Sequence, residues 1–112
     1  MQKIKEYYFK EGCYIEEWLN TDKDEALSIA RVRVLPGQTT KLHALKGTVE
    51  RYVILSGHAL VTVGSTDTKV EEKSVLSIAP DQPQKIHNTG QEDLIFLAIC
   101  TPRFLLSNYY EC

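Results

Sequence analysis

The sequence has few cysteines, and their arrangement argues against two classes of protein. Only three occur among 112 residues, at Cys13, Cys100 and Cys112, and no two have the C-x-x-C spacing of a redox motif or zinc site. An odd, widely spaced set is also not typical of a secreted disulfide scaffold. We therefore expect reduced thiols in an intracellular protein, with Cys13 and Cys100 packed as small apolar side chains in strands and Cys112 exposed.

Long apolar runs, basic stripes and catalytic loop motifs are missing as well. The start, MQKIKEYYFKEG, lacks the apolar run of a signal peptide, and no stretch approaches membrane-spanning length. The net charge is −2, with acidic and basic residues interspersed, so no basic surface is expected to follow a phosphate backbone. There is no G-x-S-x-G elbow and no phosphate-binding glycine loop. We expect a cytoplasmic protein that binds neither nucleic acid nor membrane.

What the sequence does contain is a series of short strand patterns. Hydrophobic residues make up 43% and charged residues 25%, as in globular proteins, and the length suits one domain. Apolar residues recur in short runs or at period two between turn residues, which predicts an all-β antiparallel sandwich or barrel. The expected strands are CYIEEWL (13–19), ALSIARVRVL (26–35), TTKLHAL (39–45), VERYVIL (49–55), ALVTVG (59–64), SVLSIAP (74–80), QKIHN (84–88) and DLIFLAICT (93–101).

The chain divides into three parts on this pattern. Residues 1–25 form an N-terminal arm and edge strand that pack on the barrel, residues 26–101 form the barrel, and residues 102–112 form a tail. KIKEYYF (3–9) could be an edge strand or an arm, and RFLLSNYYEC (103–112) could contain a short helical turn.

The stretch PGQTTKLHALKGTVERYVILSG (36–57) holds the first candidate site residues. In a strand, residues two apart share a face, so His43 and position 45 point the same way. By the same parity, Glu50, Tyr52 and Ile54 share one face of the next strand. His43 and Glu50 could therefore face each other across a hairpin inside the barrel.

The spacing in this stretch resembles the first motif of the cupin superfamily, G-x5-H-x-H-x3,4-E-x6-G. Gly37, His43, Glu50 and Gly57 match it in register, and only the second histidine is replaced, by Leu45.

The second cupin motif has a histidine just after a proline, followed by three residues and an asparagine. APDQPQKIHNTG (79–90) is similar to it, with Pro83 and Asn88 in place, but Gln84 stands where the histidine would be. The glycine that heads this motif is also missing. The chain looks like a small single-domain bacterial cupin of the type-2 conserved-barrel kind, with an altered metal-binding motif.

This resemblance implies a double-stranded β-helix, or jelly roll, that is commonly a homodimer. It does not imply one reaction, because the fold hosts many chemistries. A complete cupin site of three histidines and a glutamate suits Fe, Mn, Ni or Zn. Here a divalent ion of this kind (Zn, Ni, Mn or Fe) could bind through His43, Glu50 and Gln84 with water.

Two metal-free alternatives stay open for the same residues. His43, Glu50, Tyr52 and Gln84 could line a pocket for a small polar molecule, sugar- or carboxylate-like. The polar groups could instead only hydrogen-bond one another in the core, and Tyr52 could be either packing or a pocket hydroxyl. We predict ligand binding as the function. The alternative is an enzyme of isomerase, epimerase or dioxygenase type, either metal-dependent or with His43 as base and Tyr52 as acid.

The remaining histidines and two arginines are expected outside the barrel. If Gln84 faces inward, strand parity places His87 outward, and His58 is placed outward in the same way. Arg31 and Arg33 share one strand face, which could be solvent-facing, dimer-facing or, if inward, an anion pocket.

Overall fold

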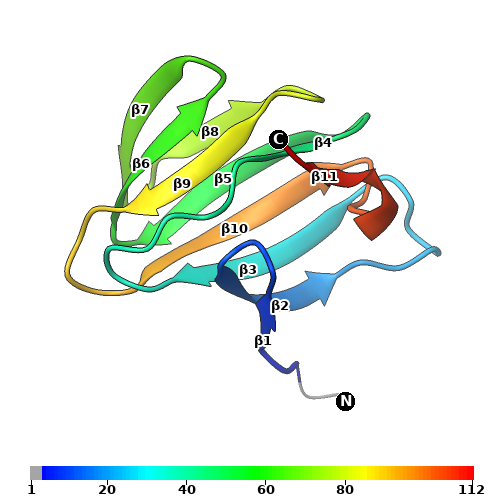
Figure 1. Cartoon of the computed structure of the whole chain (residues 1–112). Coiled ribbons are helices and arrows are strands. Elements are labelled where there is room, and N and C mark those ends of the chain that lie inside the picture. Colours follow the sequence, from blue (N-terminus) through cyan, green and yellow to red (C-terminus); the bar gives the residue numbers. More distant parts are fainter. Residues whose placement is uncertain (1–3) are drawn as a thin grey trace.

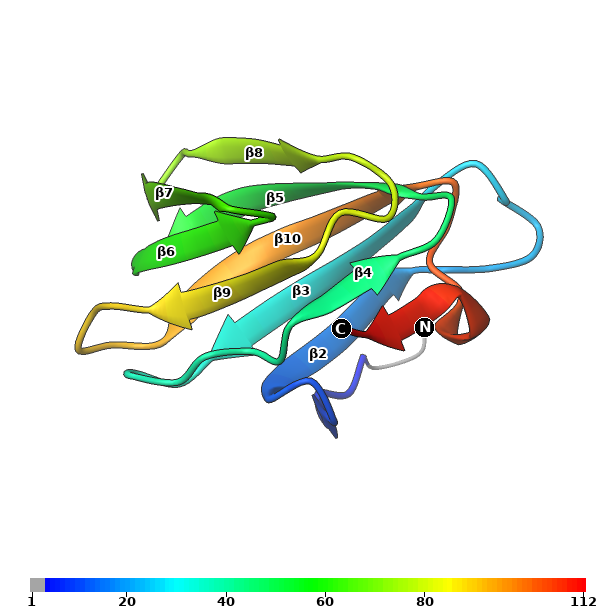
Figure 2. The same cartoon turned by 45° about the horizontal axis from the view of Figure 1, so that its top comes forward.

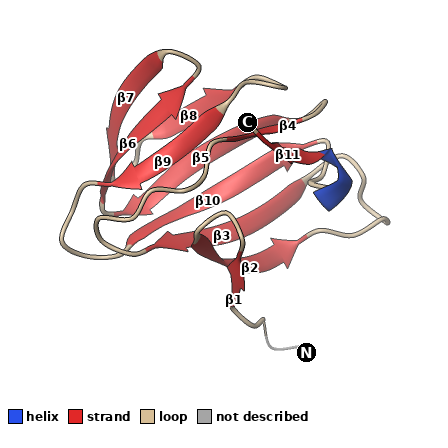
Figure 3. Cartoon of the chain, in the orientation of Figure 1, coloured by secondary structure: helices blue, strands red, loops and turns tan. Residues whose placement is uncertain are grey.

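The computed structural model describes residues 4–112, and nearly all regular structure in it is β (Figure 3). A single 3-10 turn, η1 (Leu106–Asn108), interrupts this pattern near the C-terminus. No helix in the described part of the chain is long and apolar enough to cross a membrane. The strands are β1 (Tyr7–Phe9), β2 (Cys13–Leu19), β3 (Ser28–Val34), β4 (His43–Leu45), β5 (Val49–Ser56), β6 (His58–Val63), β7 (Thr66–Glu71), β8 (Val75–Ile78), β9 (Gln84–Asn88), β10 (Leu94–Thr101) and β11 (Tyr109–Glu111).

The strands form two antiparallel sheets that face each other (Figures 1 and 2). The six-stranded sheet has the order β1-β2-β3-β10-β5-β8, and the five-stranded sheet has the order β11-β4-β9-β6-β7. The chain passes between the sheets several times, so that segments distant in sequence become neighbours. This is the double-stranded β-helix that the sequence predicts.

Most of the predicted strands are confirmed, and two are missed. CYIEEWL and QKIHN match β2 and β9 in full, and the segment KIKEYYF contributes the edge strand β1, although its first residue lies outside the described part. The C-terminal segment contains the expected helical turn, η1, but also β11, which pairs with β4. The other missed strand, β7, buries only Val70, so its sequence lacks a clear apolar face.

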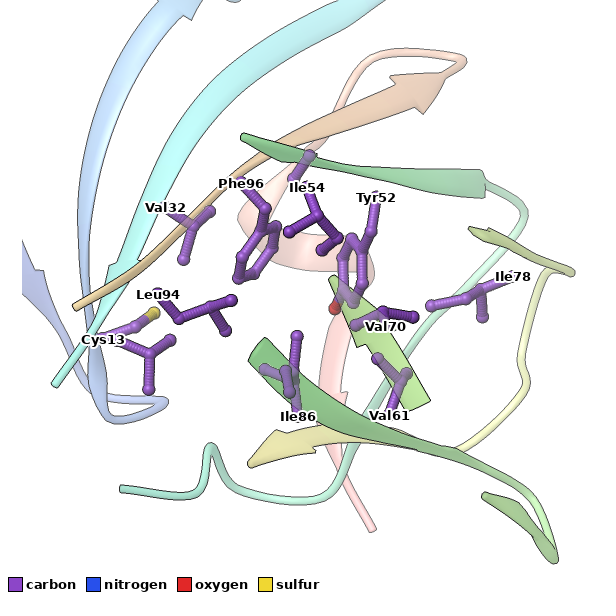
Figure 4. Packing of buried hydrophobic residues seen from close by; sticks show 13 residues of the cluster. Cys13, Val32, Tyr52, Ile54, Val61, Val70, Ile78, Ile86, Leu94 and Phe96 are labelled. Carbon is purple, nitrogen blue, oxygen red and sulfur yellow. The ribbon is translucent and has the colours of Figure 1, made fainter. Parts of the chain in front are cut away.

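The core lies between the sheets and follows the predicted period of two. In β10 every second side chain is buried, from Leu94 to Cys100. In β5 the buried positions are Glu50, Tyr52 and Ile54, which confirms that these three share the inward face. Figure 4 shows this packing, with Tyr52 directed into the core beside Phe96, at 4.6 Å between ring centroids.

The side chains expected outside the barrel lie there. Arg31 and Arg33 are on the outer face of β3, where Glu6 accepts hydrogen bonds from both guanidinium groups. His58 is exposed, and His87 lies partly exposed beside Thr39. Inward placement of the two arginines, which would have formed an anion pocket, is therefore wrong.

The cysteines also lie as expected. Cys13 and Cys100 are buried free thiols in strands, and Cys112 is exposed. Burial raises the pKa of both buried thiols far above the usual range, so neither is a reactive thiolate.

Gly57 makes the bend between β5 and β6, and alanine there should be destabilising. Its φ is +97°, and a Cβ would lie 3.0 Å from the Leu94 Cα. We expect Gly57→Ala to lower the free energy of unfolding by about 1–2 kcal/mol in urea titrations. Gly47 is the control, because its φ is +70° but a Cβ would meet nothing within 4 Å. An equal loss in Gly47→Ala would show that the contact with Leu94 does not matter.

Candidate functional site

Three strands bring the predicted site residues together between the sheets. His43 on β4, Glu50 and Tyr52 on β5, and Gln84 on β9 are all buried. His43 and Gln84 are direct cross-strand partners in the five-stranded sheet. The expected hairpin is wrong, however, because β4 and β5 belong to different sheets. His43 and Glu50 instead line a common cavity from opposite sides of the sandwich.

Gln84 connects two side chains of β5 through its amide. The Tyr52 hydroxyl donates a hydrogen bond to the amide oxygen of Gln84. The amide nitrogen of Gln84 donates to Glu50 Oε1 at 2.8 Å. Tyr52, Gln84 and Glu50 thus form a hydrogen-bonded chain that ends on a carboxyl group. Tyr52 packs against Phe96 and is one of the residues that line the cavity.

His43 is held by a second set of hydrogen bonds, which determine where its proton lies. Its Nδ1 is 2.7 Å from the Lys41 carbonyl oxygen, and because a carbonyl only accepts, Nδ1 carries a proton. Nε2 lies 3.1 Å from Glu11 Oε1. In a neutral imidazole Nε2 is then an acceptor, so the proton in this contact comes from the Glu11 carboxyl group.

Burial favours the neutral form of this pair. It raises the pKa of Glu11 to about 8, with a smaller contribution from the nearby Glu50. It also lowers the pKa of His43 below its ordinary value. Glu11 and His43 therefore share one proton near neutral pH, without a net charge. Burial raises the pKa of Glu50 to about 7, so this carboxyl group titrates in the same range.

Glu11 and Tyr109 are two site residues that the sequence did not reveal. Glu11 lies in the turn between β1 and β2, and its neighbour Gly12 has a φ of +105°. Tyr109 begins β11, and its ring stacks on that of His43 at 5.1 Å between centroids. Neither belongs to a motif, and no spacing signal marks them. They reach the site only through the pairing of β1 with β2 and of β11 with β4.

The cavity has a volume of about 70 Å³, and its lining combines polar side chains with largely apolar walls. The polar side chains include members of the two hydrogen-bonded groups just described, and also Glu17, Asn20 and Ser28. Phe96, Ala98 and Cys100 of β10 contribute to the walls, and Leu45 lines the cavity on the β4 side. Leu45 packs with Cys100 and Tyr109, so the position of the missing second histidine is an apolar wall. Gln84 is not among the lining residues, and it acts on the cavity through Tyr52 and Glu50.

The side chains expected to hold a metal ion are engaged in hydrogen bonds in this structure. The amide oxygen of Gln84, its only suitable ligand atom, already accepts the Tyr52 hydroxyl. Nε2 of His43 faces Glu11. Within residues 4–112, no group of three or more His, Cys, Asp or Glu side chains is arranged to hold a metal ion. Metal binding by His43, Glu50 and Gln84 stays a prediction, which elemental analysis of protein purified without a chelating tag would decide.

The chain is similar to known proteins in sequence and in fold. The chain is 35% identical over 104 residues to an uncharacterized protein of Methanocaldococcus jannaschii, covering 91% of this chain and 83% of that protein. It is 32% identical over 76 residues to an oxalate-binding protein of Thermotoga maritima, covering 68% of this chain and 63% of that protein. A structure of Streptomyces PAC13 with uridine superimposes with a TM-score of 0.83, over 97% of this chain and 84% of that one. At 14% identity, that likeness shows the fold alone.

The first cupin-like motif, in residues 36–57, lies within the part of the chain that matches a family model. The model of the cupin domain matches residues 30–100, which contain most of β3, all of β4 to β9 and most of β10. The chain therefore belongs to the cupin family.

Proposed function

We propose that the barrel binds a small neutral molecule that carries hydroxyl groups, such as a polyol or a sugar-like compound. The observation that supports this best is the lining of the cavity, which combines hydrogen-bonding groups with apolar walls. Glu50 accepts hydrogen bonds, and the carboxyl group of Glu11 and the imidazole of His43 add further polar groups to the lining. A hydroxyl group both donates and accepts, so it complements such a lining.

The charge of the lining favours a neutral ligand over a carboxylate. Glu11, Glu17 and Glu50 line the cavity, and among the described residues the lining contains no lysine or arginine. A buried carboxylate needs a cationic partner or several donors to replace its water. An oxalate-like anion, suggested by the name of one relative, would meet carboxyl groups instead.

Glycerol is a suitable first probe, because the cavity of about 70 Å³ is far smaller than a site for a drug-sized ligand. We expect saturable changes in the NMR amide shifts of cavity residues, with a millimolar Kd typical of so small a ligand. Oxalate at the same concentrations should give no such changes near neutral pH.

Two controls make this titration decisive. Ala98→Met should abolish the shifts by filling the cavity, whereas Ala26→Met, at an exposed position, should not affect them. The titrations are repeated in EDTA and with added Zn²⁺ or Mn²⁺, so that metal-dependent binding is recognised. Oxalate binding tighter than glycerol binding would contradict a neutral ligand.

Acid–base catalysis is a second candidate, favoured by the proton that His43 and Glu11 share on the same cavity as Tyr52. His43 would act as base and Tyr52 as acid, as in an isomerase or epimerase. Glycolaldehyde in D₂O separates the two functions. If the protein is a catalyst, it exchanges the carbon-bound hydrogens of glycolaldehyde for deuterium faster than the His43→Gln variant does. If it only binds ligands, the two proteins give the same rate of exchange. The homodimer and the cytoplasmic location expected from the sequence stay predictions.

A further inference from the structure

The hydroxyl group of Tyr109 is a buried polar group that lacks a partner. Tyr109 is 9% exposed, and its hydroxyl oxygen makes no hydrogen bond to any other atom of residues 4–112. Buried hydroxyl groups are normally paired, so such an exception calls for a physical explanation. Tyr109 also lines the cavity in which we place the ligand.

The surroundings of Tyr109 fix its ring firmly. β11 lies beside β4 (Figure 2). In the register of this pair, Tyr109 lies opposite Leu45. The ring stacks on His43 at an interplanar angle of 20°, and Phe9 packs edge-on against it at 5.3 Å between centroids. The Lys10 ammonium group lies 5.2 Å from the ring centroid. These contacts hold the ring in place, so the hydroxyl group of Tyr109 has a defined position although it makes no hydrogen bond.

The two tyrosines Tyr52 and Tyr109 both line the cavity, but only one of their hydroxyl groups already donates a hydrogen bond. The Tyr52 hydroxyl is already committed to Gln84. The Tyr109 hydroxyl is not committed to any group in the described part of the protein. Tyr109 comes from outside residues 30–100, the part that matches the family model. The family match therefore does not cover Tyr109.

We propose that Tyr109 is a specificity-determining residue of the pocket, whose hydroxyl group donates a hydrogen bond to a hydroxyl oxygen of the bound ligand. This inference rests on the proposed function and adds the residue that distinguishes a hydroxyl-bearing ligand from an apolar one of the same size. A site with a buried, unpaired hydrogen-bond donor discriminates against a ligand that has no acceptor for it.

The test compares two tyrosine-to-phenylalanine variants that each remove one hydroxyl group from the same cavity. In the ligand-free protein, Tyr109→Phe should leave the midpoint of thermal unfolding unchanged or raise it, because no bond is lost. Tyr52→Phe should lower the midpoint, because Gln84 loses a donor. In NMR titrations with glycerol, Tyr109→Phe should weaken binding about threefold to tenfold, the effect of one lost hydrogen bond.

Each outcome bears on one of the two proposals. A lower midpoint for Tyr109→Phe without ligand would overturn the inference, since it would show that the hydroxyl group has a structural partner. Glycerol binding of equal strength in Tyr109→Phe and the unaltered protein would overturn the role of Tyr109 and leave the proposed function intact. Failure of glycerol to bind the unaltered protein would overturn both.

Discussion

Replacement of Gln84 by leucine is expected to lower the free energy of unfolding by about 2–4 kcal/mol. Leucine is close to glutamine in size, so the main effect is the loss of the amide group. The Tyr52 hydroxyl then loses its acceptor and Glu50 loses its donor, and both side chains are buried. Leaving two buried polar groups unpaired is costlier than the loss of an exposed hydrogen bond. Chemical denaturation followed by fluorescence would measure the change.

The control for this variant is Gln91→Leu, because Gln91 is exposed in the turn before β10. We expect a change of less than about 0.5 kcal/mol there, as for most surface substitutions. A comparably small loss in Gln84→Leu would mean that the hydrogen-bonded chain from Tyr52 to Glu50 does not form in solution. A second readout is the pKa of Glu50, which should rise further in Gln84→Leu because the Gln84 hydrogen bond lowers it.

The chain departs from the two cupin motifs at Leu45 and Gln84, and the structure shows what each of these side chains does. Gln84 replaces a histidine by an amide that pairs with Tyr52 and Glu50, and Leu45 replaces a histidine by an apolar wall against Cys100. At these two positions the structure has a hydrogen-bonded amide group and an apolar side chain. His43 keeps its place but bonds to Glu11.

Strand parity accounts for the part of the site that could be predicted. The period of two in β5 and β9 fixes which side chains face inward, so Glu50, Tyr52 and Gln84 were identified correctly as buried neighbours. Parity says nothing about which sheet a strand joins. The sequence-adjacent strands β4 and β5 were therefore expected to pair, although they lie in different sheets.

Glu11 and Tyr109 show why the rest of the site was missed. They lie near opposite ends of the chain, and each reaches His43 only because an edge strand joins a sheet. Contacts between residues so far apart in sequence depend on the tertiary arrangement and leave no local pattern. A buried glutamate in a turn looks like any exposed one until the fold is known.

The stability of the protein is expected to fall by about 2 kcal/mol between pH 6.5 and 8. Burial raises the pKa of Glu11 to about 8 and that of Glu50 to about 7, above the value of 4.5 expected in the unfolded chain. The folded state therefore binds more protons than the unfolded state over this range. Their contribution to stability is complete below about pH 4.5 and is lost as the pH rises through the folded pKa values.

The contribution of His43 to stability changes with pH in the opposite direction. This is why the measurement starts at pH 6.5. Burial lowers the pKa of His43 below 6.5, so the unfolded state binds the extra proton and stability increases as the pH rises towards 6.5. At pH 6.5 the unfolded imidazole is still half protonated, and it becomes neutral about one pH unit higher. The fall between pH 6.5 and 8 therefore reports mainly on Glu11 and Glu50, with a small opposing contribution from His43 at its lower end.

The variant Glu11→Gln separates the contributions of Glu11 and Glu50 to the pH dependence of stability. Glutamine cannot titrate, so the fall over this range should shrink to about 1 kcal/mol, the part that belongs to Glu50. Glu72→Gln, at an exposed position, should keep the full slope. Urea unfolding at half-unit pH intervals would measure all three proteins. Stability that stays level or rises towards pH 8 would contradict the shared proton, because it would show that the folded state binds no more protons than the unfolded state over this range.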